Sequence, residues 1–352
     1  MTTSKKRTHR QEKLARIYDD EILPVWSRRF GRMLLRDLEL GERRQILDVG
    51  CGTGYPAVEI VRRLTGNSRL IAIDASSAML DIARKKVEEL GARGVFFRTE
   101  SASPRLSFAD DVYDLVVCNL GLIEMPSPAR ALADFARVTK PGGQVRCTLP
   151  LEGTFQEFYD IYREVLTKHD RHETLQRLNE HLATTYPGVV QCEHWMQSAG
   201  LDDVKVEVER FTMLFRSSRE FFFAPVIEYG PLARWKEIAG AGQEMQDVFW
   251  YIKEAIDAYF QDRAFAVTVV AGCLIGRKSS DRIAEPPVAS KAGGTGEIEL
   301  VTDDIDIAEV MAQHAAAGSG ARGPVDGGAE GEDEVELDAF IEGKKRPGHL
   351  GE

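Results

Sequence analysis

The segment LDVGCGTGY, residues 47–55, decides the fold of this chain. It places glycines at the alternate positions 50, 52 and 54, directly after an apolar run and directly before a helical one. The dinucleotide-binding fingerprint G-x-G-x-x-G needs its third glycine one residue later, where this chain has Tyr55. No Gly-Lys-Ser/Thr follows, so the segment is not a phosphate-binding P-loop either. The spacing predicts a tight turn after a strand, with its backbone close to a ligand that has no phosphate there.

Two acidic residues support this interpretation. Asp48 lies beside the glycines, where a carboxylate would repel a pyrophosphate but suit an ammonium group. Asp74 ends the apolar run RLIAID, 20 residues beyond Gly54. A carboxylate at the end of a second strand can accept both hydroxyls of a ribose and excludes a 2′-phosphate. The pair therefore favours a nucleoside ligand with an amino-acid portion.

Strand-like and helical segments alternate between residues 45 and 150, which is typical of a parallel sheet covered by helices. Helices are expected to begin near Tyr55, Ser77 and Ser127, after a further helical stretch at about residues 11–40. Helical patterns return at residues 154–196. The expected strands are 45–49, 69–73, 94–98, 113–118, 143–148, 203–215 and 264–276.

Four ordered segments carry a family resemblance: ILDVGCGTG, IDASSAML, FADDVYDLVVCN and ARVTKPGGQV, within residues 45–148. With them the chain resembles the class I S-adenosylmethionine-dependent methyltransferases of the small-molecule type. The resemblance implies a Rossmann-like α/β fold: a seven-stranded, mostly parallel sheet with helices on both faces and the last strand antiparallel. It also implies S-adenosyl-L-methionine as the cofactor.

The resemblance assigns cofactor-binding roles to matched positions. KPGG would form the turn into the fifth strand, with no cofactor contact. Asp74 would hold the ribose. The methionine portion would lie against Asp48, Gly50, Cys51, Gly52, Thr53 and Gly54, the adenosine against Ala75, Ser76 and Met79, and the sulfonium over Cys118, Asn119 and Leu120.

The sequence departs from the family pattern in two places. Related chains often place an acidic residue and Ala after the third strand, where the acid meets the adenine amino group. Here Ser101 and Ala102 take that place, and Glu100 lies one residue early. Either Glu100 reaches the adenine through a register shift, or Ser101 binds it more weakly. After the fourth strand, LIEMPSP replaces the histidine pair of small-molecule members.

Two residues are candidates for catalysis. Glu124 is expected at the carboxyl edge of the fourth strand, where it could serve as a base or remain a solvated surface residue. Tyr18 lies on the N-terminal helix that caps the cofactor site in relatives, and could equally be a core residue. The histidines at positions 169, 172, 181 and 194 lie in charged, helical surroundings without a zinc-ligand spacing, so no metal is expected.

Three regions are expected. Residues 1–40 form an N-terminal helical cap, residues 41–278 the methyltransferase domain, and residues 279–352 an acidic, mostly disordered tail. Within the domain, the aromatic-rich insertion 217–263 is expected to be a helical lid on an apolar acceptor site. Alternatively, its aromatic residues build a core of their own.

Charge limits the choice of partners. The tail contains 17 acidic and six basic residues, which accounts for the whole net charge of −11. The neutral remainder argues against a nucleic-acid substrate, and no apolar run is long enough to span a membrane. We therefore expect a cytoplasmic enzyme that methylates a small, hydrophobic or aromatic acceptor at an oxygen, carbon or nitrogen atom. The alternative is a non-catalytic cofactor-binding module that engages a protein partner through the tail.

Overall fold

The computed structural model describes residues 2–280 apart from residues 39, 43 and 262. The disorder and the partner-binding role expected of the acidic tail concern residues 279–352, which from residue 281 onward lie outside the described part of the chain. Its disorder and its role in binding a partner therefore stay predictions.

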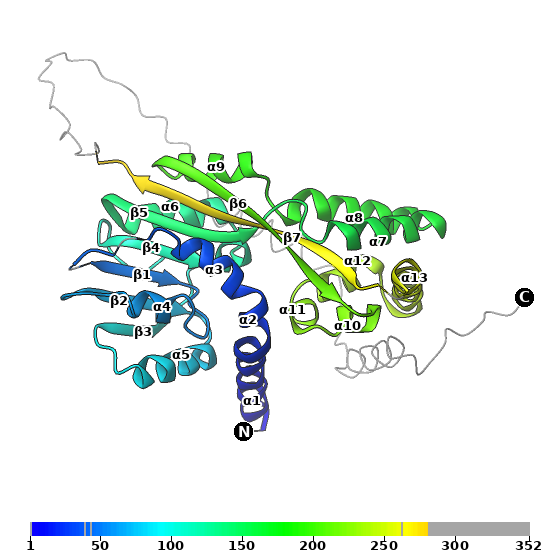
Figure 1. Ribbon diagram of the computed structural model, residues 1–352, viewed down its shortest axis with the longest axis horizontal. Helices are drawn as coiled ribbons and strands as arrows, with labels where there is room; N and C mark the ends of the chain where they lie inside the picture. Colours follow the sequence, from blue (N-terminus) through cyan, green and yellow to red (C-terminus); the bar gives the residue numbers. More distant parts are fainter. Residues whose placement is uncertain (1, 39, 43, 262, 281–352) are drawn as a thin grey trace, which may run out of the picture. The chain divides into compact units, whose positions relative to one another are not determined.

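A seven-stranded sheet forms the framework, in the order β3-β2-β1-β4-β5-β7-β6. The first five strands are parallel, and β7 runs antiparallel between β5 and β6. This confirms the fold expected from the sequence (Figure 1). The strands are β1 Gln45–Val49, β2 Arg69–Asp74, β3 Val95–Thr99, β4 Tyr113–Asn119, β5 Thr139–Pro150, β6 Leu201–Phe215 and β7 Phe265–Lys278.

Helices cover both faces of this sheet because successive residues of its strands point to opposite sides. One face packs its apolar side chains, including Leu47 and Val116, against α6 (Pro128–Val138) and α9 (Val189–Ser198). The opposite face carries α4 (Ala57–Val61) and α5 (Ser77–Glu89), which contact β2. The central strands are therefore buried on both sides, which leaves their carboxyl ends for a ligand.

The fifth strand begins earlier than the sequence suggested. The KPGG segment, expected as a turn before the strand, lies within β5, where the pairing with β4 shifts register. Tyr113 pairs with Thr139 and Leu115 with Gln144, so extra residues of β5 form an irregularity there. Gly142 has a φ of +74°, which a glycine adopts without strain.

The N-terminal segment is a broken helix. It comprises α1 (Thr2–Ile17), a π-helical turn η1 (Tyr18–Ile22), α2 (Leu23–Val25) and α3 (Ser27–Leu35). The helical stretch expected at about residues 11–40 ends at Leu35 and is interrupted by the π-helical turn and at Trp26. Because Pro24 lacks an N–H donor, the preceding turn cannot keep its regular hydrogen bonds, and the Leu23 N–H bonds to the Tyr18 carbonyl instead.

Additional helices lie at one end of the sheet. They follow β5 as α7 (Gln156–Lys168) and α8 (His172–Thr185), and they fill the insertion between β6 and β7 as α10 (Ser218–Phe222), α11 (Pro225–Glu228), α12 (Leu232–Ala239) and α13 (Gly242–Phe260). The β6–β7 pair extends beyond β5: Phe215 still pairs with Phe265, whereas the β5 pairing ends at Ala271. These helices surround the extended part of the ribbon (Figure 1).

Candidate active site

A cavity of about 660 Å³ lies at the carboxyl ends of β1, β2, β3 and β4. The N-terminal segment and α11 form its other walls. Of the residues proposed from sequence, the following line it: Tyr18, Gly50, Gly52, Asp74, Ala75, Ser76, Met79, Glu100, Ser101, Ala102, Asn119, Leu120 and Glu124. The structure thus brings together residues that are up to 106 positions apart.

The glycine loop is fixed by hydrogen bonds to the end of β2. The N–H groups of Gly50 and Cys51 both donate to the Ile73 carbonyl, at 2.9 and 3.0 Å. The Asp74 carboxylate accepts the Gly52 N–H at 2.9 Å through one oxygen and the Ser76 N–H at 2.8 Å through the other. Asp74 therefore shapes the cavity by holding the loop and the start of α5, a role that sequence alone did not suggest.

Close packing around the loop requires a glycine at position 54, whereas Gly52 makes an ordinary contact with its neighbour. Gly54 has a φ of +97°, and a Cβ there would lie 3.1 Å from the Cβ of Ala83 on α5. A Cβ at Gly52 would lie 3.5 Å from the Tyr18 ring, at the cavity wall. The loop is thus packed between α5 and the π-helical turn, and both neighbours limit the side chains it can carry.

Five residues assigned to the cofactor by resemblance are buried behind the cavity and do not line it. Thr53 donates its hydroxyl to Asp19 at 2.6 Å, and Asp19 also pairs with Lys86 on α5. Burial raises the thiol pKa of Cys51 and of Cys118 above its ordinary value, so both thiols remain neutral packing groups. The five are Asp48, Cys51, Thr53, Gly54 and Cys118.

Asp48 is a buried acid without a hydrogen-bonding partner. Its side chain is fully buried, and neither carboxylate oxygen has a donor within hydrogen-bonding geometry. The pKa of Asp48 is raised to about 8: burial contributes most of the rise and the charge of Asp74 adds to it. The nearby Ala57 amide, which does not reach hydrogen-bonding geometry, offsets only part of the rise. The group is therefore mostly protonated at neutral pH, and it stays beneath the loop instead of facing the cavity.

Tyr18 projects from the π-helical turn toward the glycine loop. Its hydroxyl is 2.7 Å from the Ser27 Oγ. Burial raises the phenol pKa above its ordinary value, the Ser27 hydrogen bond lowers it in part, and the nearby charge of Asp74 raises it. The phenol therefore keeps its proton at neutral pH, which suits a hydrogen-bond donor better than a base.

The floor of the cavity is the turn after β4. Asn119 donates its amide to the Ser27 carbonyl at 3.1 Å and accepts the Thr148 hydroxyl at 2.7 Å. The next residue, Leu120, has a left-handed φ of +68°, a strained conformation that concentrates at functional sites. Glu124 follows at the end of a 3₁₀ turn, η2 (Gly121–Glu124), and faces the cavity.

Glu100 lies at the far wall, after β3. Its carboxylate accepts the Ser107 N–H at 2.9 Å and pairs with Arg98. The pKa of Glu100 is lowered, because the hydrogen bonds from Ser107 and Arg98 together outweigh the effect of burial, which raises it. Glu100 is therefore charged, and part of its hydrogen-bonding capacity is taken by Ser107 and Arg98. Ser101 and Ala102 lie beside it in the wall.

Several lining residues were not singled out from the sequence. They lie on the N-terminal segment, after η2 and on the insertion: Ile22, Trp26, Ser27, Met125, Pro126, Val226, Tyr229 and Gly230. The helical spacing of Ile22 and Trp26 resembles that of core positions, so nothing distinguished them. Pro24, which breaks the helix between them, was the one available indication.

Two of the four histidines considered above, His169 and His181, contact neighbouring side chains. His169 stacks on Tyr251 with 3.6 Å between ring centroids, and His181 contacts Thr185. Within residues 2–280, with the gaps noted above, no cluster of His, Cys, Asp or Glu could hold a metal ion. In that same part of the chain no helix is long and apolar enough to cross a membrane.

Residues 46–143 match the family model described as a methyltransferase domain. Together with the observed fold, this match defines the class: the chain contains the methyltransferase domain of the class I S-adenosylmethionine-dependent enzymes. It is a methyltransferase that uses S-adenosylmethionine.

Two relatives with similar sequences are named demethylmenaquinone methyltransferases. The demethylmenaquinone methyltransferase of Halalkalibacterium halodurans is 28% identical over 221 residues, covering 58% of this chain and 88% of that protein. That of Bacillus cereus strain B4264 is 28% identical over 192 residues, covering 51% and 77%. Among solved structures, the YcgJ protein of Bacillus subtilis is similar at a TM-score of 0.49 and 17% identity, covering 72% of this chain and 99% of that one.

Proposed function

We propose that the cavity at the carboxyl ends of β1–β4 holds S-adenosylmethionine together with a neutral, apolar acceptor that carries an aromatic or quinol ring. The observation that carries this proposal is the convergence of the glycine loop, Asp74 and the Asn119–Leu120 turn on one cavity. Asp74, Glu100 and Glu124 line it, and among the described lining residues none is Lys, Arg or His. Such a wall favours a cationic sulfonium and disfavours an anionic acceptor.

The loop contacts leave capacity for the cofactor. Each Asp74 oxygen accepts one backbone N–H and retains a lone pair for a ribose hydroxyl. Ala75, Ser76 and Met79 would lie along the adenosine, with Glu100, Ser101 and Ala102 at the adenine edge. Asp48, Cys51, Thr53, Gly54 and Cys118 would support the loop from behind.

The acceptor class follows from the remaining walls. Ile22, Trp26, Met125, Val226 and Tyr229 give the cavity an apolar and aromatic side, which suits a flat ring. The relatives named demethylmenaquinone methyltransferases point to a quinone-class acceptor. In this proposal the insertion 217–263 acts as a cover through α11 and the turn after it.

The chemistry needs little beyond position. S-adenosylmethionine supplies an electrophilic methyl group on a good leaving group. The protein must hold the acceptor atom in line with it, and positioning alone can lower the barrier by roughly 7–11 kcal/mol. Glu124 would take the proton that the acceptor loses, from a hydroxyl or a ring carbon, and pass it to water. Tyr18, which keeps its proton, would donate a hydrogen bond and close the site.

A transfer assay with labelled cofactor tests this function. The substrates are 1,4-naphthohydroquinones, and the variant is Glu124→Gln. We expect methyl transfer by the wild type and a roughly 10²–10⁴-fold lower kcat in Glu124→Gln, the usual contribution of a general base, with unchanged cofactor affinity. Glu88→Gln, at an exposed position on α5, is the matched control.

Two results would change the interpretation. Equal kcat in Glu124→Gln and wild type would remove Glu124 from the mechanism. Cofactor binding by calorimetry without transfer to any acceptor would instead favour the non-catalytic, cofactor-binding alternative.

A further inference from the structure

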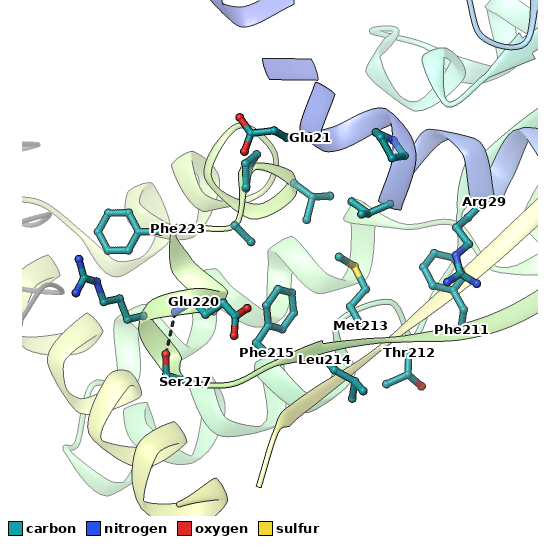
Figure 2. A pocket seen from close by; sticks show the side chains of 16 residues that line it. Glu21, Arg29, Phe211, Thr212, Met213, Leu214, Phe215, Ser217, Glu220 and Phe223 are labelled. Atoms are coloured by element: carbon teal, nitrogen blue, oxygen red, sulfur yellow. Dashed lines mark hydrogen bonds between the residues drawn. The ribbon is translucent and has the colours of Figure 1, made fainter. Parts of the chain in front are cut away.

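A second cavity of about 780 Å³ lies on the other side of the N-terminal segment. It is bounded by that segment, the end of β6, and the helices α10 and α11 (Figure 2). Its volume exceeds that of the first cavity, and none of the groups assigned to cofactor or catalysis lines it. Its apolar lining consists of Pro24, Val25, Phe211, Met213, Leu214, Phe215, Phe223, Ala224, Pro225 and Val226.

The two cavities meet at one residue and share one wall. Val226 on α11 lines both. The N-terminal segment presents Ile22 and Trp26 to the first cavity and Pro24 and Val25 to the second. The second, apolar space is therefore the neighbouring cavity that a substituent extending past Val226 from the first cavity would enter.

The lining of the second cavity favours an uncharged hydrocarbon. Phe211, Met213 and Phe215 project into it from one side of β6, whereas Thr212 and Leu214 project from the other (Figure 2). Val25, at the edge of this cavity, is 47% exposed, so its apolar surface is open to a ligand there.

The charged residues at its edge include both signs. The acidic residues are Glu21 and Glu220. The basic ones are Arg219 and Arg29, whose guanidinium lies 5.3 Å from the centre of the Phe211 ring. Because these charges oppose one another, the edge presents no single sign that would select an anionic or cationic group.

We propose that this second cavity binds a long, unbranched or isoprenoid hydrocarbon chain attached to the acceptor ring. The inference rests on the proposed function, since it places the ring of the same acceptor in the first cavity. The chain leaves the first cavity beside Val226 and lies against Met213 and Phe215. The enzyme thereby selects acceptors by the length of their apolar substituent as well as by their ring.

Equilibrium binding of a chain-length series tests the proposal without depending on turnover. The probes are 1,4-naphthoquinone and its 2-prenyl derivatives with one, two and three isoprene units, which keep an open ring carbon for the methyl group. They are titrated by quenching of tryptophan fluorescence in the presence of S-adenosylhomocysteine. We expect the three-unit compound to bind at least about tenfold more tightly than the chainless one, because each added methylene is removed from water.

Two variants on β6 localise the effect. Met213→Glu puts a charge into the second cavity, and we expect it to abolish most of the tenfold gain with chain length. Val208→Glu puts the same charge at an exposed position of the same strand that lines neither cavity, and we expect it to keep the gain. Thermal melts of both variants verify that they fold.

The outcomes separate the two proposals. Equal affinity along the series, a gain that persists in Met213→Glu, or no binding by any compound overturns the chain site. A chain-length gain in binding without any methyl transfer to the corresponding hydroquinones keeps the chain site and overturns the proposed reaction.

Discussion

Asn119 donates its side-chain amide to the backbone carbonyl of Ser27 at 3.1 Å, across 92 residues of sequence. Both groups are buried. The same side chain accepts the Thr148 hydroxyl, so one residue at the end of β4 ties the N-terminal segment to β5. The broken helix is thereby held over the cavity floor by a specific polar contact as well as by apolar packing.

Replacing Asn119 should therefore loosen the N-terminal segment. Asn119→Leu leaves the Ser27 carbonyl and the Thr148 hydroxyl without this partner, and each unsatisfied buried group costs about 1–3 kcal/mol. We expect the free energy of unfolding to fall by at least about 2 kcal/mol, and cofactor affinity to fall with it. Chemical denaturation measures the first quantity. Thr148→Val, which removes one of the two contacts, should lose about half as much; equal losses would contradict the assignment.

Asp74 should be the most sensitive cofactor contact. Asp74→Ala removes the acceptor for the Gly52 and Ser76 amides and the proposed ribose contact, so we expect at least a tenfold weaker cofactor affinity, about 1.4 kcal/mol. Calorimetry with S-adenosylmethionine and S-adenosylhomocysteine measures it. Unchanged affinity for both would show that the cofactor lies elsewhere. Asp81→Ala, at an exposed position on α5, serves as the control.

Tyr18 should act through its position and not as a base, because burial keeps its pKa above the ordinary value. Tyr18→Phe loses the Ser27 hydrogen bond, so we expect about 1 kcal/mol less stability but the same pH profile of kcat. Tyr18→Ala, which also opens the wall above Gly52, should weaken cofactor binding about tenfold. A rate limb near neutral pH that vanishes in Tyr18→Phe would instead identify the phenol as a base.

Asp48 should make stability depend on pH. Its pKa is about 8 in the folded protein and near 4 when unfolded, so the folded state binds the extra proton between these values. Stability contributed by this group is therefore full below about pH 4 and declines by roughly 1.4 kcal/mol per pH unit up to about pH 8. Asp48→Asn, which cannot ionise, should lack this decline. Denaturation curves at several pH values measure it, and parallel slopes in the two proteins would refute it.

Gly54 should not tolerate alanine. The positive φ and the 3.1 Å approach to the Ala83 Cβ both oppose a side chain, so we expect Gly54→Ala to cost about 2 kcal/mol or more. Gly91→Ala is the control, because Gly91 has a φ of +61° but open space around it. The control carries only the backbone cost. Equal melting temperatures for the two variants would show that packing against α5 contributes nothing.

Much of the framework could be predicted from the sequence because its signals are local. All seven strands lie within a few residues of the expected ranges. The central parallel strands are recognisable as short apolar runs, and β6 by its alternation of apolar and polar residues. Most residues named from the glycine loop and strand ends line one cavity, because parallel strands end at the same edge.

The departures have longer-range causes. The π-helical turn depends on Pro24 together with the Tyr18–Ser27 contact, and no periodic pattern encodes that combination. The aromatic and apolar residues of the insertion have different surroundings in its different parts, and its role as a lid stays a prediction. Trp235 stacks on Phe158 of α7 at 4.0 Å, as in a core of its own, whereas Val226 and Tyr229 line the cavity. The contact between Phe158 of α7 and Trp235 of the insertion joins residues 77 positions apart. Because such contacts decide which aromatic residues of the insertion are buried and which line the cavity, the sequence pattern alone could not separate the two groups.

The extension of β6 and β7 beyond β5 separates the helices α10–α13 from the strands that carry the glycine loop. The ribbon is anchored in the sheet at one end, and Glu157 of α7 accepts the Thr268 N–H at 2.8 Å near the other. Insertions and substitutions among α10–α13 therefore affect the part of the β6–β7 hairpin that extends beyond β5, and they leave the strands next to the glycine loop undisturbed. In the proposed function, the tip of this hairpin contributes Val226 and Tyr229 to the acceptor side of the cavity, and the ends of β1–β4 form the cofactor side, so a change at the tip would alter the choice of acceptor without touching the glycine loop.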